Sequence, residues 1–534
     1  MEYNKKYRVF FPLLFSLVLA LGMYFGFKLR DMAGNHYRVF FHGIPGGTLQ
    51  EVMDLVALKY VDSVKKSTLR KDAINGILNH LDPHSIYITP SQLQQVNNDL
   101  EGNFQGIGIE FSMFSDTVNI TSVLPNGPAE TAGLRMGDRI IRVNDSLVSG
   151  VHFGPRRVRN LMHASGGNPI ELTILRKDRL RTIEINPGNV SVSPIDASYM
   201  IVPGMGYIRI NRFSDNTYDE FMKAITALKA HGMRKLIIDL RGNPGGFLDA
   251  ATHIADELLD DHKLIVYTQG KDFPRTNYYC TKPGLFEKGK LAILVDEGSA
   301  SASEILAGAI QDWDRGLIIG RRTFGKGLVQ EQYPLEDGGA LRLTVARYYI
   351  PSGRCIQKPY NHGFAAYDED IINRFNHGEF LNADSIRIND TTRYRTLVKG
   401  RIVYGGGGIT PDIFVPFDTT RVDRLMSDIY SRSILEDFTY HYFNRHPSIF
   451  SEFTSPGNFS RHFEISPGLM QDFTRFAIAD SITAIRSMNK KESAIIGDRM
   501  KSFFARDIWR NEGYFVVANS YDPVVQRAIH ALGD

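Results

Sequence analysis

The sequence is poor in cysteine, in net charge and in metal-binding motifs, and these scarcities exclude several classes of protein. Its 534 residues include only two cysteines, too few for a zinc-finger ligand set, and no H-E-x-x-H motif. We therefore expect no metal and no cofactor. The formal net charge is only +3, and no basic helix or basic aromatic patch occurs, so nothing predicts a nucleic-acid partner. Cys280 and Cys355 could pair in an oxidising compartment, but two cysteines do not define the class.

A long apolar run, Val9–Phe27, lies near the start of the chain. Its nineteen residues are interrupted only by Ser16 and follow a basic head. At about 1.5 Å per residue in a helix, they would span most of a bilayer core of about 30 Å. The basic head predicts that the N-terminus stays in the cytoplasm and that the rest lies in the periplasm. Bulky residues over Leu21–Phe25 favour an uncleaved single-pass anchor in the inner membrane over a removed signal peptide.

A serine-rich segment, Gly298–Glu304, contains the first candidate for chemistry. The apolar run Leu291–Val295 predicts a buried strand and apolar residues at helical spacing follow it, so Ser301 lies where a strand gives way to a helix. Unpaired N–H groups and the positive end of the helix dipole favour a developing oxyanion there. The alternative is that the S-x-x-E pattern is a plain capping box. Ser299 and Ser303 are further candidate nucleophiles on local sequence.

A lysine lies between two glycines in the motif T-F-G-K-G, 25 residues after that serine. In water the amine has a pKa of about 10.4 and is protonated. Burial disfavours the charged form, so Lys326 could act as general base toward Ser301 without a histidine. The alternative is an exposed lysine in a tight turn.

The same segment, Gly320–Gly327, is one residue short of a phosphate-binding loop. Gly327 replaces the hydroxyl that such a loop needs, and a strand rather than a helix is predicted after it. We therefore reject nucleotide binding.

Another glycine-rich turn, Arg241–Gly246, follows the apolar run Leu236–Leu240 and precedes the amphipathic segment Phe247–Leu259. Strand, glycine turn and helix together expose backbone N–H groups, which an acyl-transfer site needs for its tetrahedral oxyanion. Gly246 is the main candidate donor and Gly245 the second. Turns of this kind are common, so this one alone is weak evidence.

Together these motifs resemble those of the carboxyl-terminal processing peptidases, also called tail-specific proteases. The segments D-L-R-G-N-P-G-G, S-A-S-A-S-E, T-F-G-K-G, R-Y-Y-I-P-S-G-R and G-G-I-T-P-D occur in the family's order between Met205 and Pro416. The resemblance implies a serine endopeptidase on a crotonase-like α/β core. Departures are small, because Pro244 stands where glycine is common and Cys355 where serine or another residue is common.

The resemblance also implies roles for individual residues. Ser301, the middle serine of its run, would be the nucleophile, Lys326 the base, and Gln330 the group that orients the lysine. The N–H groups of Gly246 and Ala302 would hold the oxyanion. On an extended strand, residues four apart lie roughly 13 Å from each other, so Gln330 can reach Lys326 only if the chain bends between them.

Histidines suggest no competing base. His253 lies on the helix after the glycine turn, and His84 lies in L-D-P-H-S, a motif also seen in the family's helical N-terminal part. No local pattern pairs either histidine with Ser301, so we interpret both as structural.

A second unit, over residues 98–188, resembles a PDZ domain of the bacterial protease type. It contains the loop G-I-G-I and the pattern G-P-A-x-x-A-G-L-x-x-G-D-x-I-x-x-V-N. A PDZ domain binds a peptide's C-terminus as an added strand. The N–H groups that would hold the carboxylate are those of Ile107, Gly108 and Ile109. The side chains of Val158 and Leu161 would form the wall of an apolar pocket. Unstructured apolar C-terminal tails are the expected ligands.

These signals divide the chain into five parts. We expect a cytoplasmic head and anchor over residues 1–30, a helical segment over 45–97, the PDZ-like domain over 98–188, a peptidase core over 189–417 and a helical C-terminal domain over 418–534. Within the core, the polar stretch over residues 362–399 has low periodicity and is interpreted as a surface excursion. In the last part, Asp522–Pro523 predicts the start of a helix.

The sequence therefore predicts a multidomain α/β protein, a membrane-anchored and periplasm-facing serine endopeptidase that cuts unfolded or tail-exposed proteins. Two alternatives stay open. One is a catalytically idle PDZ scaffold, which the retention of Ser301 and Lys326 disfavours. The other is an acyl-thioester enzyme on a crotonase-like fold, which the PDZ-like domain disfavours. A homo-oligomer or an adaptor partner is compatible with the prediction.

Overall fold

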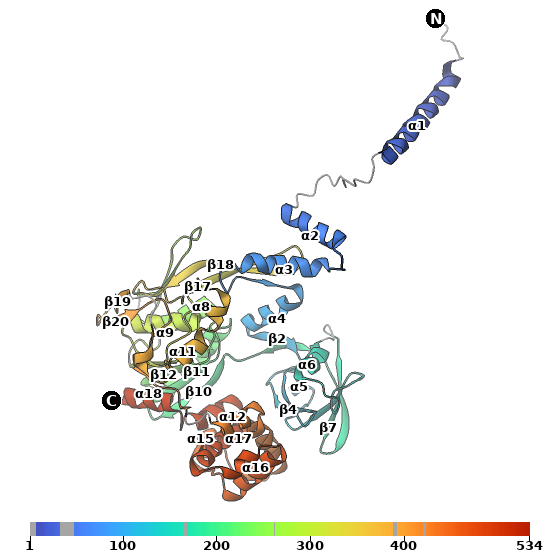
Figure 1. The fold of residues 1–534 in the computed structure, drawn as a ribbon. Coiled ribbons are helices and arrows are strands. Elements are labelled where there is room, and N and C mark those ends of the chain that lie inside the picture. Colours follow the sequence, from blue (N-terminus) through green and yellow to red (C-terminus); the bar gives the residue numbers. More distant parts are fainter. Residues whose placement is uncertain are drawn as a thin grey trace. The chain divides into compact units, whose positions relative to one another are not determined.

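The chain divides into two compact units, Met1–Ile74 and Asn75–Asp534 (Figure 1). The computed structural model describes residues 7–32, 47–163, 168–260, 262–361, 363–387, 392–419 and 423–533. The first unit contains α1 (Tyr7–Met32), α2 (Thr48–Lys59) and the greater part of α3 (Lys66–Leu78). The helical segment expected after residue 45 is thus broken at residues 60–65, where valine, aspartate and serine are weak helix formers.

The apolar run near the start does form a helix, since α1 covers Val9–Phe27. In the part of the chain that the structure describes, however, no helix is both long and apolar enough to cross a membrane.

The second unit contains a six-stranded central sheet in the order β10-β11-β12-β15-β16-β21. Its parallel strands are β11 (Met205–Ile210), β12 (Lys235–Asp239), β15 (Lys290–Val295), β16 (Leu317–Gly320) and β21 (Ile413–Phe414). One edge strand, β10 (Ile195–Val202), is antiparallel. Parallel strands connected through helices are the α/β pattern that the sequence predicted.

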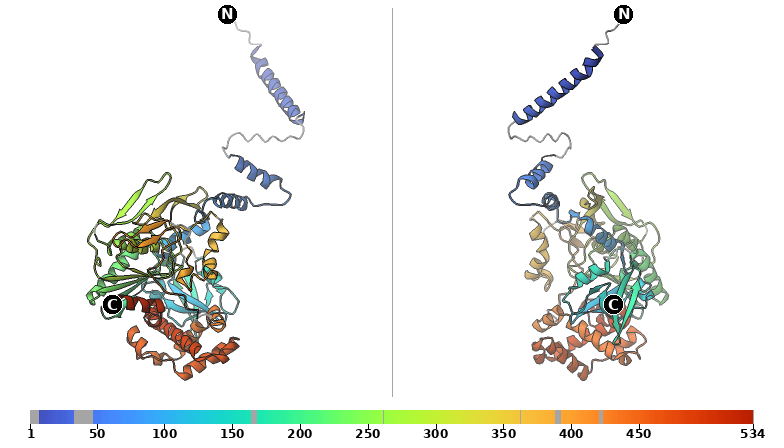
Figure 2. Two further views of the ribbon diagram at one scale, coloured as in Figure 1. Left: turned by 60° about the vertical axis from the view of Figure 1, so that its left-hand side comes forward. Right: turned by 90° about the vertical axis from the view of Figure 1, so that its right-hand side faces the viewer.

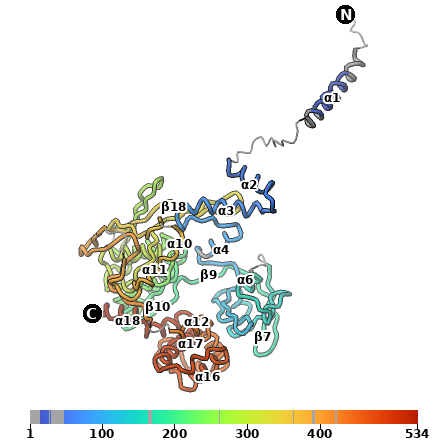
Figure 3. Tube along the Cα trace, in the orientation of Figure 1, coloured from blue at the N-terminus to red at the C-terminus, as the bar shows by residue number. Residues whose placement is uncertain are grey.

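Both faces of this sheet are covered by helices. One face packs against α7 (Thr217–Ala230), α8 (Leu248–Asp256) and α9 (Ala302–Asp312). The opposite face, which includes Tyr207, packs against α18 (Pro523–Gly533) (Figure 3). The Asp522 carboxylate accepts a hydrogen bond from the Val524 N–H at 2.9 Å, so the helix start predicted at Asp522–Pro523 is confirmed.

A second sheet borders the core and has the order β1-β18-β13-β14, with β17 also paired to β18. Its strands are β1 (Ile86–Ile88), β13 (Leu264–Gln269), β14 (Thr276–Tyr279), β17 (Leu328–Pro334) and β18 (Ala340–Tyr349). A strand, not a helix, thus follows Gly320–Gly327, as expected when that segment is not a phosphate loop. Cys280 and Cys355 are not joined by a disulfide, so the pairing considered for them does not form.

The PDZ-like domain has its own sheet and its own core. The sheet order is β3-β4-β5-β7-β8, with β6 paired to β5. These strands are β3 (Ile109–Phe114), β4 (Thr117–Val123), β5 (Arg139–Val143), β6 (Ser146–Leu147), β7 (Ile170–Arg176) and β8 (Arg179–Ile185), with helices α5 (Pro128–Thr131) and α6 (Pro155–His163). After α4 (Pro90–Glu101), the strand entering this domain, β2 (Asn103–Gly106), pairs with the strand leaving it, β9 (Gly188–Ser191).

The C-terminal part forms a helical bundle around a separate, aromatic-rich core (Figure 2). Its helices are α12 (Arg424–Ser431), α13 (Ile434–Arg445), α14 (Pro447–Phe450), α15 (Pro456–His462), α16 (Pro467–Ala479) and α17 (Lys490–Ala518), with a 3-10 turn at Thr483–Ser487. Within α17 the backbone is kinked at Trp509 and Arg510.

The polar insertion is not a surface excursion, contrary to the prediction. It contains α10 (Phe364–Asp368), α11 (Asp370–Asn376), a 3-10 turn at Ala383–Ser385 and β19 (Arg393–Arg395), which pairs with β20 (Ile402–Tyr404) just after the insertion. The Arg374 guanidinium is buried and donates to the Arg322 carbonyl at 2.7 Å and to the Thr323 carbonyl at 3.0 Å. Arg374 and Glu379 are buried as an ion pair, which hydrophobic periodicity cannot reveal, and Arg374 supports the loop that holds Lys326.

Candidate active site

Ser301 lies at the junction between β15 and α9, as the sequence predicted. Its side chain is half-buried, whereas the helix after it is buried throughout. The Ser301 backbone has φ +55° and ψ −115°, in a region that L-residues other than glycine rarely adopt. Strain of this kind persists only where the surrounding structure enforces it, and it is common at active sites.

The two neighbouring serines are occupied by structural hydrogen bonds. The Ser299 hydroxyl donates to the Leu240 carbonyl at 2.8 Å, and the Ser303 hydroxyl donates to the Asn243 carbonyl at 3.0 Å. Both serines are fully buried. Of the three candidates, Ser301 is therefore the one whose side chain solvent or a substrate can reach.

A buried carboxylate ties the serine turn to the lysine loop. Glu304 Oε2 accepts hydrogen bonds from the N–H groups of Ser301 and Lys326, each at 2.9 Å. Its Oε1 accepts from the Gly325 N–H at 2.8 Å and the Thr323 hydroxyl at 2.5 Å. The capping-box interpretation was therefore correct for the glutamate, but the same carboxylate also organises T-F-G-K-G. Because both amides donate to the same oxygen, the backbone nitrogens of Ser301 and Lys326 are no farther apart than the sum of these two 2.9 Å distances.

A second bridge joins the same two residues from the other side. Tyr348, on β18, is fully buried, and its hydroxyl contacts the carbonyl oxygens of Ser301, at 3.1 Å, and of Lys326. The fold thus positions both backbone segments independently of their side chains.

The environment of Lys326 favours the neutral amine. Burial lowers its pKa from the usual value, and the nearby Arg342 cation lowers it further, while Glu304 and Asp82 act in the opposite direction. Burial also raises the pKa of Glu304, to about 7, against four donors that favour its ionised form.

The glycine turn after β12 lies directly against Ser301. A Cβ on Gly245 would come within 2.7 Å of the Ser301 Cβ and 2.9 Å of the Ala302 nitrogen. The Gly245 N–H, however, donates to Asn243 Oδ1 at 2.9 Å, so the second-choice oxyanion donor is already engaged. Gly246 is exposed. The two hydrogen bonds between this turn and Phe213 use the Gly245 carbonyl and the Phe247 N–H, so the Gly246 N–H takes no part in them. Gly246 and Ala302 remain as the candidate oxyanion donors.

Gln330 is placed differently from the expectation. It lies on β17, where the ladder with β18 has a bulge between Val329 and Gln330. In the part of the chain that the structure describes, its amide donates to the Thr344 hydroxyl at 3.4 Å and not to the Lys326 amine. Thr344 in turn donates to Asp82 at 3.0 Å. These hydrogen bonds connect Gln330 to Asp82, and the charge of Asp82 raises the pKa of Lys326.

Sequence reasoning missed the contribution of the L-D-P-H-S motif. Asp82 is buried and accepts hydrogen bonds from the Ser85 hydroxyl at 2.6 Å and from Thr344. The His84 Nε2 lies 2.8 Å from the Tyr367 hydroxyl, and burial, together with the charge of Lys326 when that amine is protonated, lowers the pKa of His84 to about 4. His84 is thus a neutral neighbour of the lysine. No local signal shows this, because its partners lie far away in sequence.

The residues expected to bind a peptide lie around one edge of the PDZ-like domain's sheet. β3 is the end strand of its sheet, and Ile109 is its first residue. Gly108 has φ +79° and sits in the loop before it, next to the buried Ile107. On α6, Val158 is fully buried and Leu161 half-buried against the same core. Val158 is therefore chiefly a core residue, and Leu161 is the accessible member of the pair.

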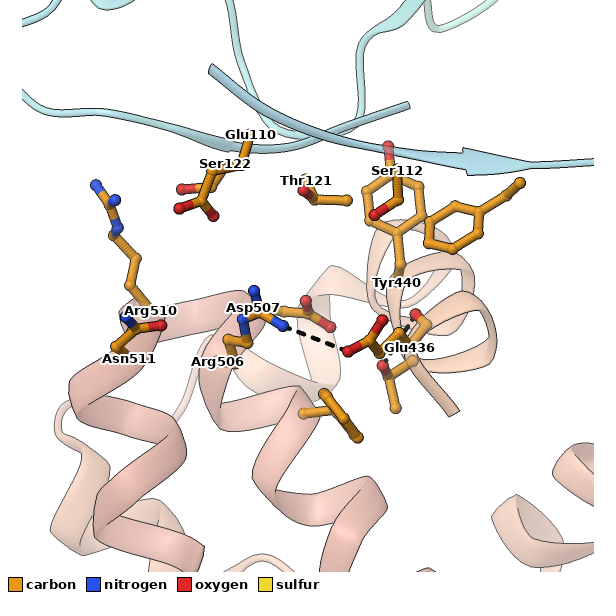
Figure 4. Close-up of a pocket in the computed structure, with 13 residues that line it drawn as sticks. Glu110, Ser112, Thr121, Ser122, Glu436, Tyr440, Arg506, Asp507, Arg510 and Asn511 are labelled. Carbon is orange, nitrogen blue, oxygen red and sulfur yellow. Dashed lines mark hydrogen bonds and ion pairs between the residues drawn. The ribbon is translucent and has the colours of Figure 1, made fainter. Parts of the chain in front are cut away.

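The outer face of β3 and β4 meets the C-terminal helices across a cavity of about 150 Å³ (Figure 4). The cavity is lined by Glu110, Ser112 and Ser122 on one side and by Glu436, Asp507 and Arg510 on the other. Beside it, the Phe114 and Tyr440 rings are 5.4 Å apart. The helical domain therefore touches the same strand whose free edge is the expected binding edge.

A strained serine, a desolvated lysine and a glycine turn are features of a serine hydrolase. The PDZ-like domain adds a peptide-binding module. Family models agree. Residues 204–365 match Peptidase family S41, residues 105–186 match the PDZ domain, and residues 425–510 match a family of unknown function, DUF8443.

Curated relatives are also serine proteases. The chain is 35% identical to a carboxy-terminal-processing protease of Bartonella bacilliformis, over 58% of this chain and 71% of that protein. It is 33% identical to a probable CtpA-like serine protease of Staphylococcus haemolyticus, over 59% of this chain and 65% of that one. A solved photosystem II D1 C-terminal processing protease is 26% identical, with 70% and 90% of the two chains covered and a TM-score of 0.34. The chain belongs to peptidase family S41 and is a serine-type peptidase.

The shared carboxylate gives a testable prediction. Glu304→Gln is expected to lower kcat by about a hundredfold with little change in KM, because an amide NH₂ would face two N–H donors and displace Ser301 from Lys326. Steady-state kinetics on a peptide substrate measures this. Glu297→Gln is the matched control. It alters an ion pair between Glu297, in the turn before α9, and Arg321, and it should keep most activity. Equal losses in both variants would contradict the prediction.

Proposed function

We propose that Ser301 and Lys326 perform the peptidase reaction as a nucleophile–base pair on a crotonase-like core. The observation that supports this most strongly is the Glu304 oxygen shared by their two backbone amides. A lysine with a lowered pKa can accept a proton at a pH where a solvated lysine cannot.

The proposed reaction begins when the neutral Lys326 amine takes the proton of the Ser301 hydroxyl as its oxygen attacks the scissile carbonyl. The N–H groups of Gly246 and Ala302, at the glycine turn and the start of α9, stabilise the oxyanion. Lys326 then gives the proton to the leaving amine. A water molecule, deprotonated by the same lysine, attacks the acyl-enzyme. The bond to the Ser301 oxygen breaks, Lys326 returns the proton to that oxygen, and the new C-terminus is released. Gln330 acts as a positioning residue through Thr344 and Asp82.

The substrates that we propose are proteins with unstructured, apolar C-terminal tails. β-strand addition to the edge of β3 would place a tail's terminal side chain between that strand and α6. The carboxy-terminal-processing activity named for the Bartonella relative supports this class of substrate.

Competition between two tails tests the proposal. One substrate ends in apolar residues and a second, otherwise identical, ends in two aspartates; we expect cleavage to favour the first by about tenfold or more. Leu161→Asp should remove most of that preference, because it places a charge in the apolar pocket. Leu180→Asp is the control, since Leu180 is 66% exposed on the same domain. An undiminished preference in Leu161→Asp would refute tail selection by this groove.

The location of the enzyme belongs to the proposal as well. The basic head and the apolar run Val9–Phe27 support attachment at the inner membrane with the peptidase in the periplasm. Fractionation of cells expressing the full chain, followed by protease accessibility from the periplasmic side, tests this. Recovery of the protein in the cytosolic fraction would contradict it.

A further inference from the structure

A cavity of about 280 Å³ lies where the carboxyl ends of the central strands meet α17 and the turn before α18. Four arginines line it, from four different elements: Arg209, Arg241, Arg321 and Arg499. Two carboxylates, Asp296 and Asp522, also line it. The cavity is therefore richer in cations than in anions.

Three of the arginines already have carboxylate partners. Arg209 pairs with Asp239 at 3.0 Å, Arg241 with Asp522 at 2.9 Å and Arg321 with Glu297 at 2.8 Å. These ion pairs hold the three arginine side chains in place and leave little of their charge for a ligand to neutralise.

Arg499 differs from the other three. It forms no ion pair with any residue in the described part of the chain. Its Nη1 donates to the Tyr514 hydroxyl at 3.2 Å, its carbon Cζ lies 5.8 Å from the Tyr430 ring, and its Nε is buried without a hydrogen-bond partner. Arg499 as a whole is half-buried. A guanidinium remains charged at any pH a protein tolerates, and a charge partly removed from water ordinarily has a counter-ion.

The carboxylates of the cavity are engaged elsewhere. Asp296 Oδ1 accepts from the N–H groups of Gly242 and Gly298, at 2.8 and 3.0 Å, and burial raises the pKa of Asp296. Asp522 holds Arg241 through both oxygens and also caps α18. Neither is placed as the counter-ion of Arg499.

We propose that this cavity binds a small oxyanion, a phosphate or the carboxylate of a peptide, with Arg499 as its principal ligand and Tyr514 beside it. A guanidinium matches both anions in geometry and charge. The volume is near the lower end of small-molecule sites, about 300 Å³, and suits one compact group rather than a nucleotide.

The position of the cavity suggests what occupancy does. Gly242 and Asp296 form part of its wall, and they belong to the two turns that continue into Gly246 and Ser301. An anion held by Arg499 on α17 would link the C-terminal domain to the back of both turns. Occupancy therefore stabilises the arrangement behind the site without touching the reacting atoms.

Thermal unfolding of the full chain carrying Ser301→Ala tests the proposal without cleavage of any ligand. Inorganic phosphate, titrated against sodium chloride of equal ionic strength, should raise the midpoint saturably by about 3 °C. A short peptide with a free C-terminus and its amidated twin form the second arm. A saturable shift with phosphate assigns an inorganic source. A shift with the free peptide alone assigns a peptide carboxylate if Arg499→Gln removes it and Leu161→Asp, in the PDZ-like domain, does not.

Arg499→Gln should abolish the shift with either ligand, and Tyr514→Phe should weaken binding several-fold. Arg506→Gln, on the exposed part of the same helix, is the control and should bind as the parent does. If Arg499→Gln does not fold, the proposal is tested by the weaker binding expected for Tyr514→Phe and by calorimetric titration of the parent protein with each ligand. No saturable binding of either ligand, or equal binding by Arg499→Gln, overturns the proposal.

Discussion

Replacing Ser301 with alanine is expected to abolish cleavage of an unfolded, apolar-tailed protein while tail binding is retained. The substitution removes the attacking oxygen and leaves the Glu304 and Tyr348 bridges, which use backbone atoms of Ser301, in place. Loss of a nucleophile of this kind typically lowers kcat by about 10⁴-fold or more. Gel-based cleavage kinetics measures the rate, and fluorescence anisotropy of a labelled tail measures binding.

Ser303→Ala is the matched control for this experiment. Ser303 lies two residues further along the same run, and its hydroxyl makes one buried hydrogen bond to the Asn243 carbonyl. Its loss should cost about 1 kcal/mol of stability and leave most activity. Cleavage by Ser301→Ala at the parent rate would refute the nucleophile assignment, and so would an equally complete loss in Ser303→Ala.

The second large effect is expected at the base. Lys326→Arg should be inactive, with kcat/KM lowered by about 10³-fold or more, because a guanidinium cannot give up its proton. In the parent enzyme the neutral fraction of the amine rises with pH, so kcat/KM should rise with pH and level off at a midpoint below 10.5, the usual lysine pKa. A pH–rate profile measures both predictions.

Arg342→Gln separates this electrostatic explanation from a purely structural one. The Arg342 cation lowers the pKa of Lys326, so its removal should move the midpoint to higher pH while the plateau rate stays near that of the parent. An active Lys326→Arg would exclude the lysine as base. A profile that Arg342→Gln leaves unmoved would contradict the role of that charge.

The same shift has a consequence for stability. The folded-state pKa of Lys326 lies below the unfolded value, so between the two the unfolded chain binds more protons and stability rises with pH. Below that window the buried amine is destabilising. Catalytic competence and stability are therefore opposed at this position.

The local segments of the site were predictable because each has a signature of its own. The strand before Ser301, the glycine turn before Gly246 and the strand after Lys326 were all read from apolar runs and glycines, and the structure has them there. Their mutual contacts were not predictable from spacing. The capping interpretation of Glu304 considered only the helix that follows it, whereas the carboxylate also holds Lys326, 22 residues away.

The remaining errors share one cause, which is burial of polar groups. Arg374 and Glu379 looked like solvent-exposed charges, yet both are buried around Arg322. Gly245 was the second candidate oxyanion donor, yet an asparagine side chain occupies its amide. Hydrophobic patterning identifies which side chains leave water, but it contains no information on which polar group each buried donor will find.

The packing of α18 on the central sheet also affects how this protein is made. Apolar side chains of β11, β12 and β15 form their finished contacts only with residues 524–532. During translation, one apolar face of the sheet stays exposed to solvent until these residues have left the ribosome. A transcript truncated before this helix should therefore yield insoluble polypeptide rather than a smaller working enzyme.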